Sequence, residues 1–187
     1  MKFSKLEIRD IVKAWFTVSL MFAIALTGLK QELLVALLFA LVTAGIGFVL
    51  HELAHKFVAQ KYKCQAEFRA NNRMLLVGLI ISFTGFILAA PGGVFVQGAN
   101  KSQHGKIAFA GPLMNILLAI LFLVLTKTTT GLLANVMLYG WLINSWLAAF
   151  NLIPVIPFDG RAVWLWNKIV YVIAVIVSLG LVGFSMG

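Results

Sequence analysis

Two histidines and a glutamate lie together at the end of a long apolar stretch. They are His51, Glu52 and His55, in the pattern HELAH, and they follow directly on the uncharged run 33–50. Residues four apart on a helix share one face, so both imidazoles can reach one metal ion while Glu52 lies beside it. This HExxH spacing is typical of zinc-dependent peptidases, in which the histidines bind the metal and the glutamate handles protons.

The alternative is a pair of structural histidines, because a pattern with two free positions recurs by chance. The chain has 3 His in total, and two of them fall within this motif. Ionisable groups beside a membrane-length apolar run are costly unless they have a partner or a function. We therefore favour a metal site that includes His51 and His55, with Glu52 as the catalytic base.

A catalytic zinc site has three protein ligands and one open position. The candidates for the third ligand are Asp10, Cys64, Glu67, His104 and Asp159. The first four lie among basic or polar loop residues. Asp159 instead ends a long uncharged run, in NLIPVIPFDG (151–160), where Pro154 and Pro157 interrupt helical hydrogen bonding. The sequence therefore favours Asp159, carried on irregular backbone at the membrane edge.

The composition is that of a membrane protein. The chain is 61% hydrophobic and 11% charged, whereas soluble domains average about 25% charged residues. We expect an all-α polytopic membrane protein with about five to six transmembrane helices, in a single integral membrane domain over residues 1–187. The expected crossings are 11–29, 32–59, 106–126, 131–156 and 165–186.

The net charge of +9 does not indicate a nucleic-acid partner. The lysines and arginines fall in short loops between apolar runs, where they orient a membrane protein, and they form no basic stripe interleaved with aromatics. The lipid bilayer is the partner that this pattern predicts.

The apolar stretch 74–99 decides the topology, because PGG (91–93) interrupts it. If it returns instead of crossing, only Lys30 and Lys127 lie on the side opposite the N-terminus, as the positive-inside rule prefers. A return also places HExxH and Asp159 on the same side of a hydrocarbon core about 30 Å thick. We therefore expect a membrane-inserted re-entrant or β-hairpin segment around 74–99, with the N-terminus and the active site toward the cytoplasm.

Three motifs in this order resemble the site-2 protease family of intramembrane zinc metalloproteases. They are HELAH at 51–55, GPLMN at 111–115 and FNLIPVIPFDG at 150–160. The resemblance covers a core of about residues 33–165. HExxH alone is a weak signal, but the combination with a proline-rich segment ending in DG is specific.

The resemblance implies a zinc endopeptidase that hydrolyses peptide bonds in or near transmembrane segments of membrane-anchored protein substrates, in regulated intramembrane proteolysis. One Zn²⁺ would be held by His51, His55 and Asp159, with Glu52 as general base toward the zinc-activated water. Asn115 would face the site and help to hold the substrate or the oxyanion. The alternative for Asn115 is an interhelical hydrogen bond, which polar residues in membrane bundles often form.

A helical substrate must present extended backbone to be cleaved, and an edge strand can receive it by β-augmentation. We expect GGVFV (92–96) to be this edge, although a simple turn is the alternative. The expected substrate-binding residues are Gly93, Val94, Phe95 and Asn151. Asn151 has bracing of its own loop as its alternative role. Arg161 stands where many members of the family have a second glycine after DG.

Two alternatives to a zinc peptidase remain open, and a third is rejected. A membrane metal-ion transporter, or a metal-binding membrane protein without protease activity, would use the same ligands. A serine protease is suggested by G-x-S-x-G at 183–187, but this motif requires a strand-to-helix elbow and a base, so we interpret it as small residues for helix packing. The sequence does not identify the substrate or the oligomeric state.

Overall fold

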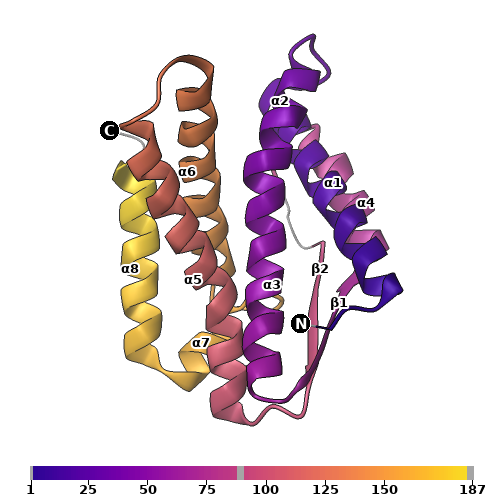
Figure 1. The fold of residues 1–187 in the computed structure, drawn as a ribbon, viewed down its shortest axis with the longest axis vertical. Helices are drawn as coiled ribbons and strands as arrows, with labels where there is room; N and C mark the ends of the chain where they lie inside the picture. Colours follow the sequence, from indigo (N-terminus) through magenta and orange to yellow (C-terminus); the bar gives the residue numbers. More distant parts are fainter. Residues whose placement is uncertain (1, 88–90, 185–187) are drawn as a thin grey trace.

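The fold is a helical bundle that carries one small antiparallel hairpin (Figure 1). The computed structural model describes residues 2–87 and 91–184. In chain order the elements are α1 (Lys5–Thr27), α2 (Leu33–Ala40), the π-helical turn η1 (Leu41–Gly45), α3 (Ile46–Lys61), β1 (Gln65–Ala70), α4 (Asn72–Ser82), β2 (Gly92–Gln97), α5 (Lys101–Thr126), α6 (Gly131–Asn151), α7 (Gly160–Trp166) and α8 (Lys168–Phe184). The expectation of an all-α polytopic protein with a β-hairpin segment is confirmed.

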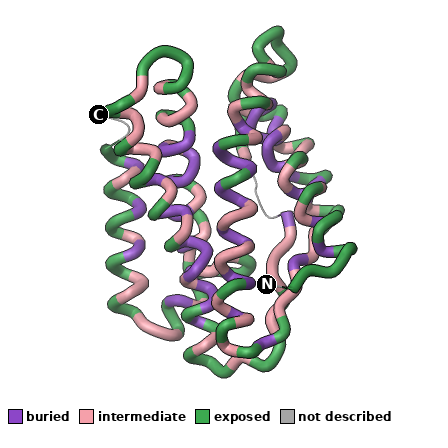
Figure 2. Tube along the Cα trace, viewed as in Figure 1, coloured by how far each residue is buried: buried purple, intermediate pink, exposed green. Residues whose placement is uncertain are grey.

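Four helices are long and apolar enough to span a membrane. They are α1, the continuous helix Leu33–Lys61, α5 and α6, and each matches an expected crossing. The fifth expected crossing, 165–186, corresponds to α8, which has 17 residues and so lies at the short end of the range for a span. Many large apolar side chains are exposed, among them Leu34, Leu132 and Ile176, and exposed residues recur along the lengths of the helices (Figure 2). This is the surface expected of a multi-pass membrane protein, whose outer solvent is lipid.

The chain between β1 and β2 leaves the sheet and comes back to it. The two strands are antiparallel with Ala70 opposite Gly92, and the Asn71 N–H donates to the Pro91 carbonyl at 2.8 Å. Helix α4 lies beside α1, and β2 runs back along α3 (Figure 1). Because both ends of the segment meet at one point, it returns and does not cross, as expected. Residues 88–90 of this segment lie outside the described part of the chain.

The helix that carries HExxH contains one π turn, η1, which α1 covers. A π turn leaves carbonyl groups without their helical partners. The Trp15 indole N–H donates to the Leu41 carbonyl at 3.1 Å, and the Ser19 hydroxyl lies 3.4 Å from the Ala40 carbonyl. A Cβ at position 45 would overlap the Trp15 indole, so Gly45 allows this close approach. Contacts with α1 therefore stabilise the irregular turn that precedes the motif.

A buried ion pair joins α1 to α3 next to the motif. Lys56 donates to both carboxylate oxygens of Glu7 at 2.6 Å, and both side chains are almost completely buried. Glu7 Oε1 also accepts the Phe68 N–H of β1 at 2.9 Å, and Asp10 Oδ2 accepts the Ala70 N–H at 3.2 Å. Helix α1 therefore satisfies the outer edge of β1 and holds the hairpin against α3.

Replacing Lys56 with Met should destabilise the fold strongly, because it leaves the Glu7 carboxylate buried and uncompensated. Breaking one side of a buried pair costs about 3–5 kcal/mol. The double variant Lys56→Met/Glu7→Gln should recover much of this loss, since the Gln carbonyl still accepts the Phe68 N–H. Unfolding of the purified protein in detergent measures both effects. Lys61→Met, at an exposed lysine of the same helix, is the matched control, and an equal loss in Lys56→Met and Lys61→Met would contradict the assignment.

Candidate metal centre

The three predicted metal ligands converge on one point. His51 Nε2 and His55 Nε2 each lie 3.2 Å from Asp159 Oδ2, and the two Nε2 atoms lie 3.0 Å apart. The imidazole rings are nearly perpendicular, at 85°. His51 and His55 come from one face of α3, and Asp159 comes from the loop between α6 and α7. The structure therefore brings HExxH and Asp159 together, as the expected topology requires.

The spacing of these three atoms suits zinc. A tetrahedral zinc ion with bonds of about 2.0–2.1 Å separates its ligand atoms by about 3.3–3.4 Å. The observed distances of 3.0 to 3.2 Å are close to this separation, so His51, His55 and Asp159 could hold such an ion. His51 and His55 are 5% and 6% exposed, whereas the Asp159 side chain is 22% exposed. The open side of the site therefore lies toward Asp159.

Hydrogen bonds at Nδ1 of each imidazole determine that the lone pair of each ring lies on Nε2, the nitrogen that faces the centre. His55 Nδ1 lies 2.7 Å from the Ile107 carbonyl, which can only accept, so Nδ1 carries the proton. His51 Nδ1 lies 2.6 Å from Asn115 Oδ1. Each Nε2 then turns a lone pair toward the other and toward a carboxylate oxygen, an arrangement that requires a shared proton or a metal cation between them.

A chain of amides fixes the orientation of Asn115. The Asn144 amide donates to the carbonyl of Gly140 in its own helix at 2.8 Å, so its oxygen faces Asn115. The Asn115 amide donates to that oxygen at 3.0 Å and to the Gly47 carbonyl at 3.2 Å. Asn115 Oδ1 is thereby presented to His51 as an acceptor. Both asparagines are completely buried.

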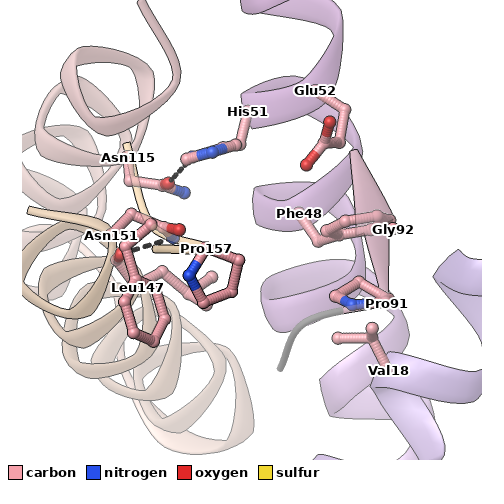
Figure 3. Close-up of a pocket in the computed structure, with 11 residues that line it drawn as sticks. Val18, Phe48, His51, Glu52, Pro91, Gly92, Asn115, Leu147, Asn151 and Pro157 are labelled. Carbon is pink, nitrogen blue, oxygen red and sulfur yellow. Dashed lines mark hydrogen bonds between the residues drawn. The ribbon is translucent and has the colours of Figure 1, made fainter. Parts of the chain in front are cut away.

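Asn115 thus makes the interhelical hydrogen bonds that were its alternative role. It also contributes to the lining of a small cavity of about 70 Å³ beside His51 (Figure 3). Its predicted contact with the substrate or oxyanion stays a prediction. Asn144 was not identified from the sequence, although a polar residue inside an apolar helix is a signal for such a contact.

Glycines allow α3 to pack closely against α5 and α6. A Cβ at Gly111 would overlap Nε2 of both histidines, and a Cβ at Gly47 would overlap the Asn144 side chain. Gly111 begins the GPLMN motif, and it gives the metal ligands the space that any larger residue would fill. Its role could not be inferred without knowing which face of α5 meets α3.

The loop 152–158 positions Asp159 at the start of α7. Helix α6 ends at Asn151, and the prolines that follow prevent its continuation. The Asp159 carbonyl accepts the N–H groups of Ala162 and Val163. A Cβ at Gly160 would collide with the Leu152 carbonyl, which explains the glycine of the DG pair. Burial raises the pKa of the Asp159 carboxyl, but the neighbouring imidazoles hold that pKa well below its ordinary value, as an anionic ligand requires.

Glu52 lies beside the centre with a free carboxylate oxygen. It is 8% exposed, and its Oε2 has no hydrogen-bond partner among the described residues. A buried carboxylate oxygen without a partner is costly. Glu52 lines the small cavity beside His51 and also a larger cavity of about 270 Å³, which Asp159 lines as well. A water molecule or a metal-bound group in these cavities would supply the missing partner.

The predicted substrate-binding residues are placed differently from one another. Gly93, Val94 and Asn151 line the 270 Å³ cavity together with the metal ligands. Phe95 is not part of that lining, and its side chain is 67% exposed. The Asn151 amide donates to the Leu147 carbonyl at 2.9 Å, which is consistent with bracing the end of α6. The substrate roles of all four residues stay predictions.

The rejected ligand candidates are not part of the group of three donor atoms, although His104 lines the same 270 Å³ cavity. Asp10 contacts Lys13 and β1, and Glu67 contacts Ser4 and Arg69. Cys64 is buried behind the hairpin, and His104 is exposed. Of the G-x-S-x-G motif at 183–187, residues 185–187, including Ser185, lie outside the described residues.

Helices with the length of membrane spans and a His–His–Asp centre beside a glutamate define a membrane protein with a candidate metal site. Two proteins of Methanocaldococcus jannaschii are similar to this chain. One, named "Putative zinc metalloprotease MJ0611", is 35% identical over 190 residues, which cover 99% of this chain and 95% of that protein. The other, named "Zinc metalloprotease MJ0392", is 30% identical over 148 residues, or 78% of this chain and 38% of that protein.

The chain belongs to the family of these zinc metalloproteases. No protein-family model and no solved structure matches it. The names of the relatives indicate zinc as the metal, and the His–His–Asp donor set fits that ion.

Replacing Asn144 with Leu should weaken zinc binding about 10- to 100-fold, the usual effect of losing a group that orients a metal-binding histidine. The change removes the acceptor that turns Asn115 toward His51. Competition with a chelating dye measures the affinity without any activity assay. Ser145→Ala is the matched control, since Ser145 is equally buried and its hydroxyl donates to the Trp141 carbonyl of its own helix. Equal zinc affinity in the two variants would count against the amide chain.

Proposed function

We propose that this protein is an intramembrane zinc endopeptidase of the site-2 protease type, which cleaves membrane-anchored protein substrates in or near their transmembrane segments. The observation that supports this most strongly is the meeting of His51, His55 and Asp159 at a cavity that also contains Glu52 and the strand β2. A transporter needs the three ligands, but it has no need of a general base or a substrate-receiving strand.

Zinc held by these three residues would act as a Lewis acid on the scissile carbonyl and lower the pKa of a bound water to about 7. The residues of the chain perform the rest. His51 and His55 offer Nε2 because their Nδ1 protons are held by Asn115 and Ile107. Glu52 accepts the proton of the attacking water and passes it to the leaving amine. Its carboxylate is suited to this because it is buried next to the ligands and Oε2 is free.

The free edge of β2 is suited to receive the substrate backbone. In an antiparallel pair, alternate residues direct their N–H and C=O groups toward and away from the partner. The N–H groups of Phe68 and Ala70 in β1 point to α1. The backbone groups of the residues paired with them, Val94 and Gly92, therefore point away from β1. The Val94 N–H faces Glu52. An extended peptide added along this edge would pass beside the catalytic base and the metal ligands.

The Glu52→Gln variant should bind zinc as the wild type does and cleave at least about 100-fold more slowly, since general-base catalysis contributes 10²–10⁴-fold. The assay uses purified protein in detergent with model transmembrane substrates, and zinc content is measured on the same samples. Asp159→Asn should lose both zinc and cleavage. Cleavage that survives both Glu52→Gln and a chelator would refute the zinc-dependent mechanism with Glu52 as base. Metal flux in vesicles without any cleavage would indicate the transporter.

Single cysteines at positions 104 and 161 should react with impermeant reagents from the cytoplasmic side, and one at 127 from the opposite side. Positions 104 and 161 belong to the starts of α5 and α7. The starts of these two helices lie at the end of the bundle where α3 ends, and the turn after α5 lies at the other end (Figure 1). The native Cys64 is first replaced by Ser. Labelling of 104 and 127 from the same side would contradict the proposed orientation.

A further inference from the structure

A second cavity adjoins the metal centre and is lined by basic side chains. It has a volume of about 460 Å³ and contains Lys101, His104 and Arg161. Four residues line both this cavity and the cavity of the metal centre: His104, Pro157, Phe158 and Ala162. The two spaces are therefore neighbours that share one wall.

The positive charges of this cavity have no acidic side chain beside them in its lining. None of the described residues that line it is acidic. Across the part of the chain that the structure describes, neither Lys101 nor Arg161 forms an ion pair, and the Asp159 carboxylate faces the histidines instead. Lys101, His104 and Arg161 are all exposed. Unpaired cations around one concave surface favour an anionic ligand.

Apolar side chains complete the cavity. Ile156, Phe158 and Leu165 line it together with the basic residues. A cavity with an apolar wall and a cationic rim accommodates a side chain that has a hydrocarbon stem and an anionic end. Glutamate and aspartate have this character.

The path of the proposed substrate leads to this cavity. A peptide added to the free edge of β2 passes Val94 beside Glu52 and then Val96. Ala99, which follows β2, lines the basic cavity. Each residue of an extended strand advances about 3.3 Å, so a side chain roughly three to five residues from the cleaved bond would reach Lys101 and Arg161.

We propose that Lys101, His104 and Arg161 form a subsite for an acidic side chain of the substrate, about three to five residues from the cleaved bond. This inference rests on the proposed peptidase function. The subsite acts on recognition, and the metal ligands and Glu52 carry out hydrolysis.

The test compares two model transmembrane substrates that differ only in Glu or Gln at this distance from the cleaved bond. With the purified full chain in detergent, the Glu substrate should have a KM about three- to tenfold lower than the Gln substrate, with similar kcat. The double variant Lys101→Gln/Arg161→Gln should bring the ratio of the two KM values close to one, and Arg161→Lys should retain most of the preference. Raising the salt concentration should reduce the preference, because exposed charges are screened.

Lys61→Gln is the matched control, since Lys61 is an exposed lysine at the same end of the bundle that does not line the cavity. It should leave the preference intact. Equal KM values for the two substrates with the wild type, while both are cleaved, would overturn the subsite and leave the peptidase standing. Absence of cleavage of either substrate would overturn both.

The same substrates are then compared in neutral vesicles and in vesicles with anionic lipid. A preference for Glu that persists in neutral vesicles supports the peptide subsite. An effect of Lys101→Gln/Arg161→Gln that is equal for both substrates and appears only with anionic lipid would assign the cavity to a lipid headgroup and overturn the proposal.

Discussion

Three hydrogen-bond acceptor atoms direct their lone pairs at one another at a buried point of this protein, and the surrounding structure depends on that arrangement. His51 Nε2, His55 Nε2 and Asp159 Oδ2 lie within 3.2 Å of one another. They repel unless a cation lies between them, so the fold must hold them together. Much of what surrounds the centre serves this purpose: the Ile107 carbonyl, the Asn115–Asn144 pair and the hydrogen-bonded turn at the start of α7.

The hairpin and the first helix serve a different requirement. In the proposed peptidase, the two-stranded sheet would receive a substrate beside Glu52 only along an edge that no other element occupies. Glu7 and Asp10 close the outer edge of β1 by accepting its N–H groups, and the buried Lys56–Glu7 pair links this closure to α3. The opposite edge of the sheet, on β2, remains beside the metal ligands. Helix α1 thereby covers the outer edge of β1 and leaves β2 as the strand that faces the metal ligands.

The membrane imposes a direction on the whole arrangement. Helix α3 ends and α5 begins at the same end of the bundle (Figure 1). The metal ligands of α3 lie in the half of the continuous helix Leu33–Lys61 that leads to this end, while many large apolar side chains along the helices are exposed. Hydrolysis needs water, and water is scarce in the hydrocarbon core. If the protein is the proposed peptidase, a site at the end of the spans, next to a basic cavity, would give water access to a membrane substrate.

Local and periodic features were predictable from the sequence alone. HExxH places two imidazoles on one helical face because helices repeat every 3.6 residues, the apolar runs give the spans because bilayer thickness is fixed, and the prolines before Asp159 end a helix because proline cannot donate. The return of 74–99 followed from the positive-inside rule. The contacts of Asn144, Gly111 and the Lys56–Glu7 pair could not be predicted, because each joins elements far apart in the chain. Only the packing of particular helix faces decides which buried polar groups meet and where a missing Cβ leaves space for a metal ion.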